Sequence, residues 1–296
     1  MKNKIICIAL LGIILGCQKP DNEINFILDN VEQGAVLRTI SSEGEYNFYA
    51  PEASVFKLTM EEHDIENGAL TQNVEVYLSH NGGGEVLYKT IQPTEFTTGP
   101  TGLPRTDLKL SLAEATNAIG LSSSQYKGGD QITIRLQLNL KDGRNFSSDD
   151  VTGSLTGSYF ASPYEYNQVI KCIPLSAVPG IYTYTLADSY GDGWQGSHLK
   201  VTVDGVVKNY GIPSPYDSDA ERNAILEPFS GNDSGGSVSL TIPQGAKTME
   251  FEWVSGDWPS ECSYTITYTK LDGSNEQNAI SESNPANGVK VLSICQ

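Results

Sequence analysis

Apolar and polar residues alternate one by one along the second half of this chain, and this period of two limits the possible folds more than any other feature. The apolar positions form four runs: Leu199, Val201 and Val203; Val238, Leu240 and Ile242; Met249, Phe251 and Trp253; Tyr264, Ile266 and Tyr268. Successive side chains of a β-strand point to opposite faces, so each run predicts a strand with one buried face. With no helical period in this half, we expect an all-β sandwich of jelly-roll or immunoglobulin-like kind.

The first half shows the same alternation with one exception. Strand patterns occur at residues 56 to 60, 74 to 78 and 132 to 138, which predicts an immunoglobulin-like sandwich over residues 36 to 160. The exception begins at Ser111, a plausible N-cap with Glu114 three residues on and Gly120 as a stop signal. We therefore expect one short helix in this sandwich.

Glycine, serine, tyrosine and proline are frequent at residues 153 to 168, which we interpret as the crossing between two domains. The second domain is then expected at residues 169 to 296. Asp-Gly pairs at Asp204-Gly205 and Asp272-Gly273 predict tight turns between its strands. Residues 17 to 35 are polar and are expected to form a linker.

The N-terminus has the order of a signal peptide: charged residues up to Lys4, an apolar run from Ile5 to Leu15, then Gly16 and Cys17. The apolar run is too short to span a membrane, which needs about 20 residues. The stretch from Ile14 to Cys17 resembles the lipobox of bacterial lipoproteins. This resemblance implies cleavage after residue 16, acylation of Cys17 and a lasting lipid anchor; the alternative is an ordinary secretory signal with an incidental cysteine.

The residues after Cys17 bear on where such an anchor would hold the protein. No Asp follows Cys17 directly, the feature that retains many lipoproteins at the inner membrane, so we expect an outer-membrane location. Lys19 with the acidic residues near it resembles the surface-export signal of Bacteroidetes lipoproteins, although Pro20 interrupts that pattern. Display on the cell surface is the expectation that follows.

The charge of the chain excludes some partners. Its formal net charge is −17, and no Lys/Arg cluster offsets it. Such a chain repels phosphate backbones, so nucleic acid is not an expected partner. Neutral glycans, cations and other proteins remain.

Three cysteines follow Cys17: Cys172, Cys262 and Cys295. A disulfide persists outside the cytoplasm, but the sequence alone does not fix which two residues pair. We favour Cys172 with Cys295, because the two bracket the second half of the chain and would tie its first strand to its last. Cys262 would then be a buried free thiol.

The run from Asp188 to Gly196 reads DSYGDGWQG and is the most distinctive segment of the chain. It resembles the "DSYGDGW" domain of Bacteroidetes surface and secreted proteins, in which a second element like residues 256 to 261 precedes a late strand and cysteines sit near both domain ends. The likeness covers about residues 170 to 296 and implies no activity. Cys262 departs from it, since an apolar residue is expected there, and so the pairing stays open.

The segment from residue 29 to residue 38 resembles lipoproteins that accompany outer-membrane polysaccharide-uptake systems. That resemblance implies a role beside an outer-membrane transporter or other surface proteins.

Two Asp residues in a Gly-rich loop can turn both carboxylates toward one point, because glycine permits a tight path. Ca²⁺ takes six to eight oxygen ligands, so Asp188 and Asp192 are candidate calcium ligands. Asp257 or Glu261 completes the set if both loops lie at one end of the sandwich. The alternative is that Asp188 and Asp192 only cap backbone amides in a turn.

Trp194 and Trp258 fall in the same two loops, off the alternating inner faces, and Tyr190 lies beside them. Exposed aromatic rings at a sandwich end can stack on sugar rings or anchor a protein, so all three are candidate ligand-binding residues, with Tyr210 and Tyr216 as an extended rim. The alternative is that both tryptophans fold back and seal the core.

Signs of catalysis are few. The histidines His63, His80 and His198 accompany no known catalytic motif. Glu61 and Glu62 are adjacent on a strand and so point to opposite faces, which argues against a paired-carboxylate site. We expect a non-catalytic surface lipoprotein that binds glycans or assists polysaccharide uptake. The alternative is a Ca²⁺-stabilised structural or adhesive protein, and a glycoside hydrolase is the third possibility.

Overall fold

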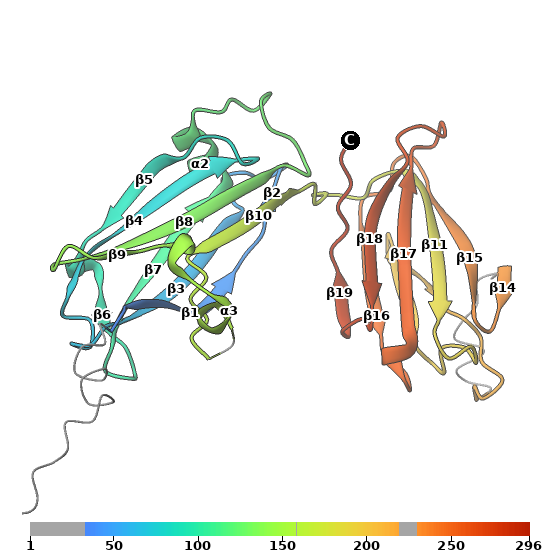
Figure 1. Ribbon diagram of the computed structural model, residues 1–296. Coiled ribbons are helices and arrows are strands. Elements are labelled where there is room, and N and C mark those ends of the chain that lie inside the picture. The colour runs from blue at the N-terminus through green and yellow to red at the C-terminus, as the bar shows by residue number, and fades with distance from the viewer. Residues whose placement is uncertain (1–32, 158, 219–229) are drawn as a thin grey trace, which may run out of the picture.

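The computed structural model describes residues 33–157, 159–218 and 230–296. They form two β-sandwiches, each with two sheets and its own buried core (Figure 1). The prediction of an all-β fold is confirmed. The predictions of a signal peptide, of acylation at Cys17 and of most of the linker fall on residues 1–32, outside the described residues.

The first sandwich packs a four-stranded sheet against a sheet of six strands. The four-stranded sheet has the order β1 (Val36–Glu43), β3 (Val55–His63), β7 (Pro104–Ser111) and β6 (Thr97–Thr98). The other sheet has the order β2 (Tyr46–Asn47), β10 (Glu165–Lys171), β8 (Gln131–Leu140), β4 (Thr71–His80) and β5 (Val86–Ile91), with β9 (Asn145–Phe146) beside β8. All neighbours are antiparallel except β2 and β10.

The alternation of the sequence becomes the core of this sandwich. Phe56, Leu58 and Met60 of β3 are buried, and so is every second residue of β8 from Ile132 to Leu140. Burying one apolar face of each sheet against the other drives such packing at about 25 cal/mol per Å². The sandwich core therefore lies between β3 and β7 on one side and β4 and β8 on the other.

The predicted helix is α2 (Leu112–Ile119). Ser111 Oγ accepts a hydrogen bond from the Glu114 N–H, and the Glu114 carboxylate accepts one from the Ser111 N–H. Gly120 ends the helix at φ 84°, a left-handed conformation that glycine adopts without steric cost. The other helical pieces of this sandwich are single turns: η1 (Pro93–Glu95), η2 (Ser148–Asp150) and α3 (Gly153–Thr156).

The domain boundary lies later than the sequence suggested. Residues 153 to 168 were expected to cross between domains, with the second domain starting at residue 169. Instead, β10 pairs with β8 and β2 of the first sandwich, and Tyr164, Tyr166 and Ile170 join its core. The residues just before β10 are rich in turn formers, and the composition of this stretch therefore predicted a loop where a strand follows.

The second sandwich packs a five-stranded sheet against a four-stranded one. The first has the order β14 (Ser230–Asn232), β15 (Gly235–Ile242), β11 (Gly180–Asp188), β17 (Cys262–Thr269) and β18 (Gln277–Ser283). The second has the order β13 (Val206–Tyr210), β12 (His198–Val203), β16 (Met249–Val254) and β19 (Gly288–Lys290). A single turn, η3 (Pro259–Glu261), precedes β17.

Aromatic rings fill much of the second core. Tyr184 stacks on Tyr210 with ring centroids 4.6 Å apart, and Trp253 stacks on Tyr264 at 5.7 Å. Such pairs add about 0.5–1.5 kcal/mol beyond the area that they bury. The predicted turns at Asp204-Gly205 and Asp272-Gly273 connect β12 to β13 and β17 to β18.

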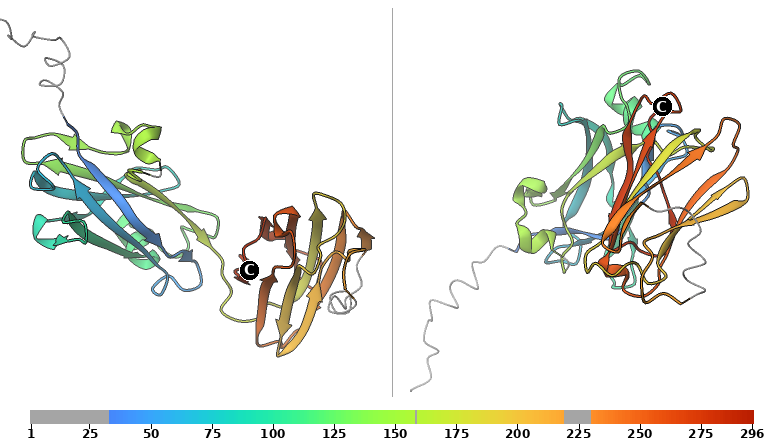
Figure 2. Two further views of the ribbon diagram at one scale, coloured as in Figure 1. Left: turned by 90° about the horizontal axis from the view of Figure 1, so that it is seen from below. Right: turned by 90° about the vertical axis from the view of Figure 1, so that its right-hand side faces the viewer.

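A disulfide joins Cys172 to Cys295, and Cys262 is a buried free thiol, so the favoured pairing is confirmed. Cys172 directly follows β10, at the start of the segment between β10 and β11 that links the two sandwiches; Figure 2 shows this segment between them. Gly128 of the first sandwich sits against the disulfide: a Cβ at this position would lie 2.0 Å from the Cys172 sulfur.

Hydrogen bonds from the first sandwich also reach this junction. The Asn47 side chain donates to the Ile173 carbonyl and accepts from its N–H. The Tyr49 hydroxyl donates to the Ile294 carbonyl and accepts from the Gln296 N–H. The two ends of the second domain are thus held together beside the first.

Among the residues described, no helix is long and apolar enough to cross a membrane.

Candidate functional site

The DSYGDGW segment forms a tight loop around one carboxylate. Asp188 ends β11, is buried, and accepts hydrogen bonds from four backbone N–H groups at 2.7–3.2 Å, those of residues 190 to 193. Gly191 and Gly193 have φ of 94° and 89°, which glycine adopts without strain. A Cβ on Gly193 would lie 2.5 Å from the Pro213 carbonyl oxygen. The capping interpretation therefore explains Asp188 and both glycines.

Three of the four predicted calcium ligands come together. One ligand oxygen from each of Asp188, Asp192 and Glu261 lies within 4.8 Å of the others, because the Ser189 N–H donates to the Glu261 carbonyl and joins the two loops. Desolvation and then the charges of Asp188 and Asp192 raise the pKa of Glu261. Asp257 is exposed and does not belong to this group, so of the two residues considered for the remaining ligand the structure brings only Glu261 to Asp188 and Asp192.

Trp194 is not a ligand-binding residue. Its ring is 0% exposed and packs edge-on against Trp253 at a centroid distance of 5.1 Å. Its indole N–H donates to the Ala187 carbonyl, which satisfies the one polar atom of the side chain. The tight turn at Gly193 directs the ring into the core, so the sealing interpretation is correct for this residue.

Trp258, unlike Trp194, is exposed to solvent. Its side chain is 66% exposed, and its backbone is left-handed at φ 55°, ψ 45°. A bulky residue rarely adopts this conformation, which costs about 1–2 kcal/mol. The Trp258 carbonyl accepts the Glu261 N–H and so starts the turn η3. A large apolar ring is thus held in water at a position where glycine or asparagine would be less strained.

Two exposed tyrosines lie nearby along a chain of bonded loops: the Tyr190 loop is bonded to the Trp258 loop, and the Tyr216 loop is bonded to the Tyr190 loop. Tyr190 is 76% exposed in the Asp188 loop, and Tyr216 is exposed in the loop after β13. The Asp257 N–H donates to the Gln195 carbonyl, and the Ser214 hydroxyl donates to the Asp192 carbonyl. We call Trp258, Tyr190 and Tyr216 the aromatic rim. Tyr210, also considered for this rim, is buried against Tyr184 instead.

Cys262, the first residue of β17, is buried and unreactive. Burial raises the pKa of its thiol to about 12, and the sulfur contacts the Trp258 carbonyl. A thiol with so high a pKa is not a nucleophile at neutral pH.

The histidines make structural contacts. His80 Nε2 is 3.0 Å from the Asp130 carboxylate, and His198 Nδ1 is 2.8 Å from the Gly196 carbonyl. His63 is exposed at the end of β3. None of the three is a member of the acidic group found among the described residues.

Sequence reasoning did not foresee that both Glu61 and Glu62 are buried, with side chains on opposite faces of β3. Burial opposes ionisation of Glu61, but hydrogen bonds from Thr101 and Arg105 and the charges of two arginines outweigh it and lower its pKa. A period-two pattern predicts the face of a residue, and it does not show that a loop will cover the outer face.

No protein-family model matches this chain, and no match was found among curated proteins.

Proposed function

We propose that this protein is a non-catalytic surface lipoprotein that binds neutral glycans through the aromatic rim of its second sandwich. The observation that carries the proposal is the exposed, left-handed Trp258. Strain retained at one exposed side chain points to a role for that side chain outside folding. A flat aromatic ring suits the apolar face of a sugar ring, and Tyr190 and Tyr216 offer two further rings on adjoining loops.

Charge also favours a neutral ligand. The chain carries a net charge of −17, and the loops that carry Tyr190 and Trp258 also hold the carboxylates of Asp188, Asp192 and Glu261. These charges repel anionic polymers, whereas they accept hydrogen bonds from sugar hydroxyls.

The experiment is affinity gel electrophoresis of the chain without residues 1–16, using gels that contain soluble starch, laminarin, galactomannan or neutral xylan. We expect retardation by at least one of these, and a dissociation constant at least tenfold weaker for Trp258→Asn, equal to about 1.4 kcal/mol. Asparagine tolerates the left-handed conformation, so this variant should melt no lower than the parent. Tyr159→Ala, which removes an exposed ring of the first sandwich, is the matched control. Equal mobility in every gel with and without polysaccharide contradicts the proposal.

Attachment to the outer membrane is the part of the proposal that rests on the N-terminal sequence. Labelled palmitate should appear on the expressed chain and disappear in Cys17→Ser. Protease added to intact cells should remove the two sandwiches if they face outward. A Cys17→Ser chain that stays in the membrane fraction would contradict lipid anchoring.

Calcium binding in a structural or adhesive role is the second candidate, and the convergence of Asp188, Asp192 and Glu261 favours it. Calcium that binds only the folded chain must raise its melting temperature. Glu261→Gln should abolish that rise, because its side chain makes no hydrogen bond to a described residue and its loss leaves the loop intact. Asp257→Asn should retain the rise. An unchanged melting temperature at saturating calcium removes this candidate.

A further inference from the structure

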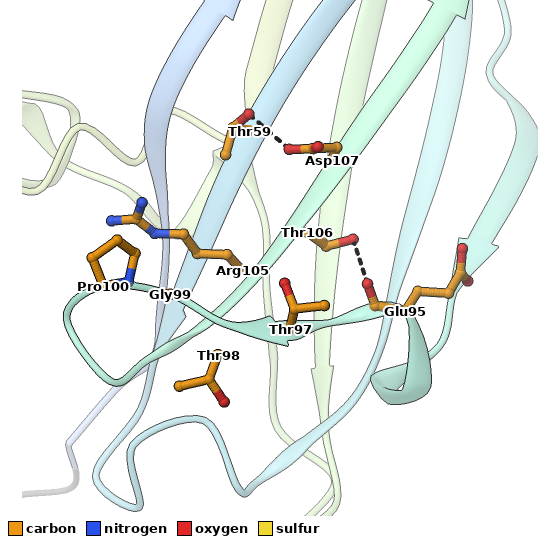
Figure 3. A pocket seen from close by; sticks show the side chains of 9 residues that line it. All are labelled: Thr59, Glu95, Thr97, Thr98, Gly99, Pro100, Arg105, Thr106 and Asp107. Carbon is orange, nitrogen blue, oxygen red and sulfur yellow. Dashed lines mark hydrogen bonds between the residues drawn. The ribbon is translucent and has the colours of Figure 1, made fainter.

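A polar notch opens at one edge of the first sandwich. β6 pairs with β7 only at Pro104 and Arg105, so this edge of β7 has no strand partner from Thr106 onward within the described part of the chain. A pocket of about 450 Å³ lies there (Figure 3). We call it the β7 notch; its walls include Thr59, Thr97, Arg105 and Asp107.

Arg105 is fixed on one side of the notch. Its Nε donates to the Glu61 carboxylate at 2.7 Å, and Glu61 is itself 1% exposed and accepts a bond from the Thr101 hydroxyl at 2.6 Å. Gly99 lies on the side chain of Arg105, where a Cβ would approach Nε to 2.6 Å. The two terminal nitrogens of this guanidinium donate to no described residue, so they remain as oriented donors.

Asp107 is fixed on another side. Its Oδ1 accepts a hydrogen bond from the Thr59 hydroxyl at 2.7 Å (Figure 3), and its Oδ2 accepts none from the described residues. Thr97 faces Arg105 across β6 and β7, and both Thr97 and Thr98 are exposed. Hydroxyls can donate and accept, so the notch presents fixed groups of both kinds.

The charges and the surfaces of the notch select the ligand. Two carboxylates, those of Glu95 and Asp107, line the notch with one guanidinium. Lys89 pairs with Glu95, and Glu61 pairs with Arg105. Asp107 is therefore left as the charge without an ion pair among the described residues, which disfavours an anionic ligand. The lining side chains include no aromatic ring, so the notch does not suit a flat apolar group. A ligand whose adjacent hydroxyls both donate and accept satisfies Arg105 and Asp107 together.

We propose that the β7 notch is a saccharide subsite, which binds one neutral sugar residue between Arg105, Asp107 and the threonine hydroxyls. This inference rests on the proposed function, since it assumes that the protein's ligand is a neutral glycan. It adds a second point of contact on the other sandwich. Two weak sites on one chain bind a long polymer more tightly than either site alone when the polymer spans both.

The test is a two-dimensional amide NMR titration of the chain without residues 1–16 with neutral hexasaccharides of glucose (α-1,4 and β-1,3), mannose and xylose. We expect two separate sets of shifted amides, one at residues 97 to 107 and one in the rim loops. Asp107→Ala should raise the dissociation constant measured from the amides of residues 97 to 107 at least tenfold. It should leave the constant measured from the rim loops unchanged. Trp258→Asn should do the reverse. Asp149→Asn, an exposed carboxylate of the same sandwich, should change neither.

Each other result decides the matter. Shifts confined to the rim loops overturn the notch and leave the proposed function standing. Shifts confined to residues 97 to 107 support the notch and contradict the role of the rim. No shift with any of the four sugars overturns both. Equal shifts on adding acetate or glycine show a site for small ions and overturn the saccharide assignment.

Discussion

Glu62 offers the sharpest test of the forces inside the first sandwich. It follows Phe56, Leu58 and Met60 on the inner face of β3 and is 0% exposed. Neither of its carboxylate oxygens makes a hydrogen bond of good geometry within the described residues. Burial, and then the negative charge of Asp64, raises the pKa of Glu62 from 4.5 to about 8. The folded protein therefore holds this carboxyl protonated at neutral pH.

The size of the effect follows from this pKa. The unfolded chain ionises Glu62 near pH 4.5, so unfolding releases a proton between pH 4.5 and about 8. The contribution of Glu62 to the free energy of unfolding is complete below pH 4.5 and falls by about 1.4 kcal/mol per pH unit as the pH rises to 8, in total about 5 kcal/mol. Glu62→Gln keeps the shape of the neutral acid and removes the titration. Relative to the parent, this variant should gain about 3.5 kcal/mol between pH 5 and pH 8.

The assay is urea unfolding followed by far-UV circular dichroism and by amide hydrogen exchange in β3, at several values between pH 5 and pH 8. All three tryptophans lie in the second sandwich, so their fluorescence reports that sandwich separately. Glu66→Gln, an exposed carboxylate in the adjacent turn, is the control and should show no such trend. A constant difference between Glu62→Gln and the parent at every pH would refute the reasoning.

Four further outcomes are expected. Replacing Cys172 and Cys295 together with serine should lower the free energy of unfolding of the second sandwich by up to about 5 kcal/mol in the chain-entropy account, measured by urea unfolding with tryptophan fluorescence. Trp194→Ala should cost about 3–5 kcal/mol by the same measurement, because it empties a fully buried site. Asp188→Ala should shift its loop amides into fast hydrogen exchange, because four N–H groups lose their acceptor. Ser111→Ala should lower the free energy of unfolding of the first sandwich by about 1 kcal/mol, followed by circular dichroism.

The alternation of apolar residues predicted β3, β4 and β8 of the first sandwich and β12, β15, β16 and β17 of the second, because the period of two is a local property. The same holds for α2, whose capping residues Ser111 and Glu114 are three positions apart and meet as expected. The second half of the chain was the easier one, since its Asp-Gly turns mark where strands end. Strand β10 was missed because turn-forming residues precede it and because Gln168 interrupts the apolar alternation between Tyr166 and Ile170.

The candidate site was only partly predictable. The convergence of Asp188, Asp192 and Glu261 depended on two loops meeting at one end of the sandwich, which turn positions made plausible. Trp194 and Trp258 look alike in sequence, each after a Gly-Asp pair or close to one, yet one is buried and the other exposed. Trp194 is buried next to the tight turn at Gly193, whereas Trp258 is exposed on a left-handed backbone. Neither conformation can be read from the residues around it.

The disulfide also changes what a single cut by a protease would do. Cys172 and Cys295 are 123 residues apart in the sequence, and nearly all of the second sandwich lies inside the ring that they close. Hydrolysis of one peptide bond inside this ring leaves both pieces covalently joined, with their strands still paired in the same sheets. Outside a cell, where proteases are common and reducing agents scarce, this module can be nicked in an exposed loop and still stay in one piece.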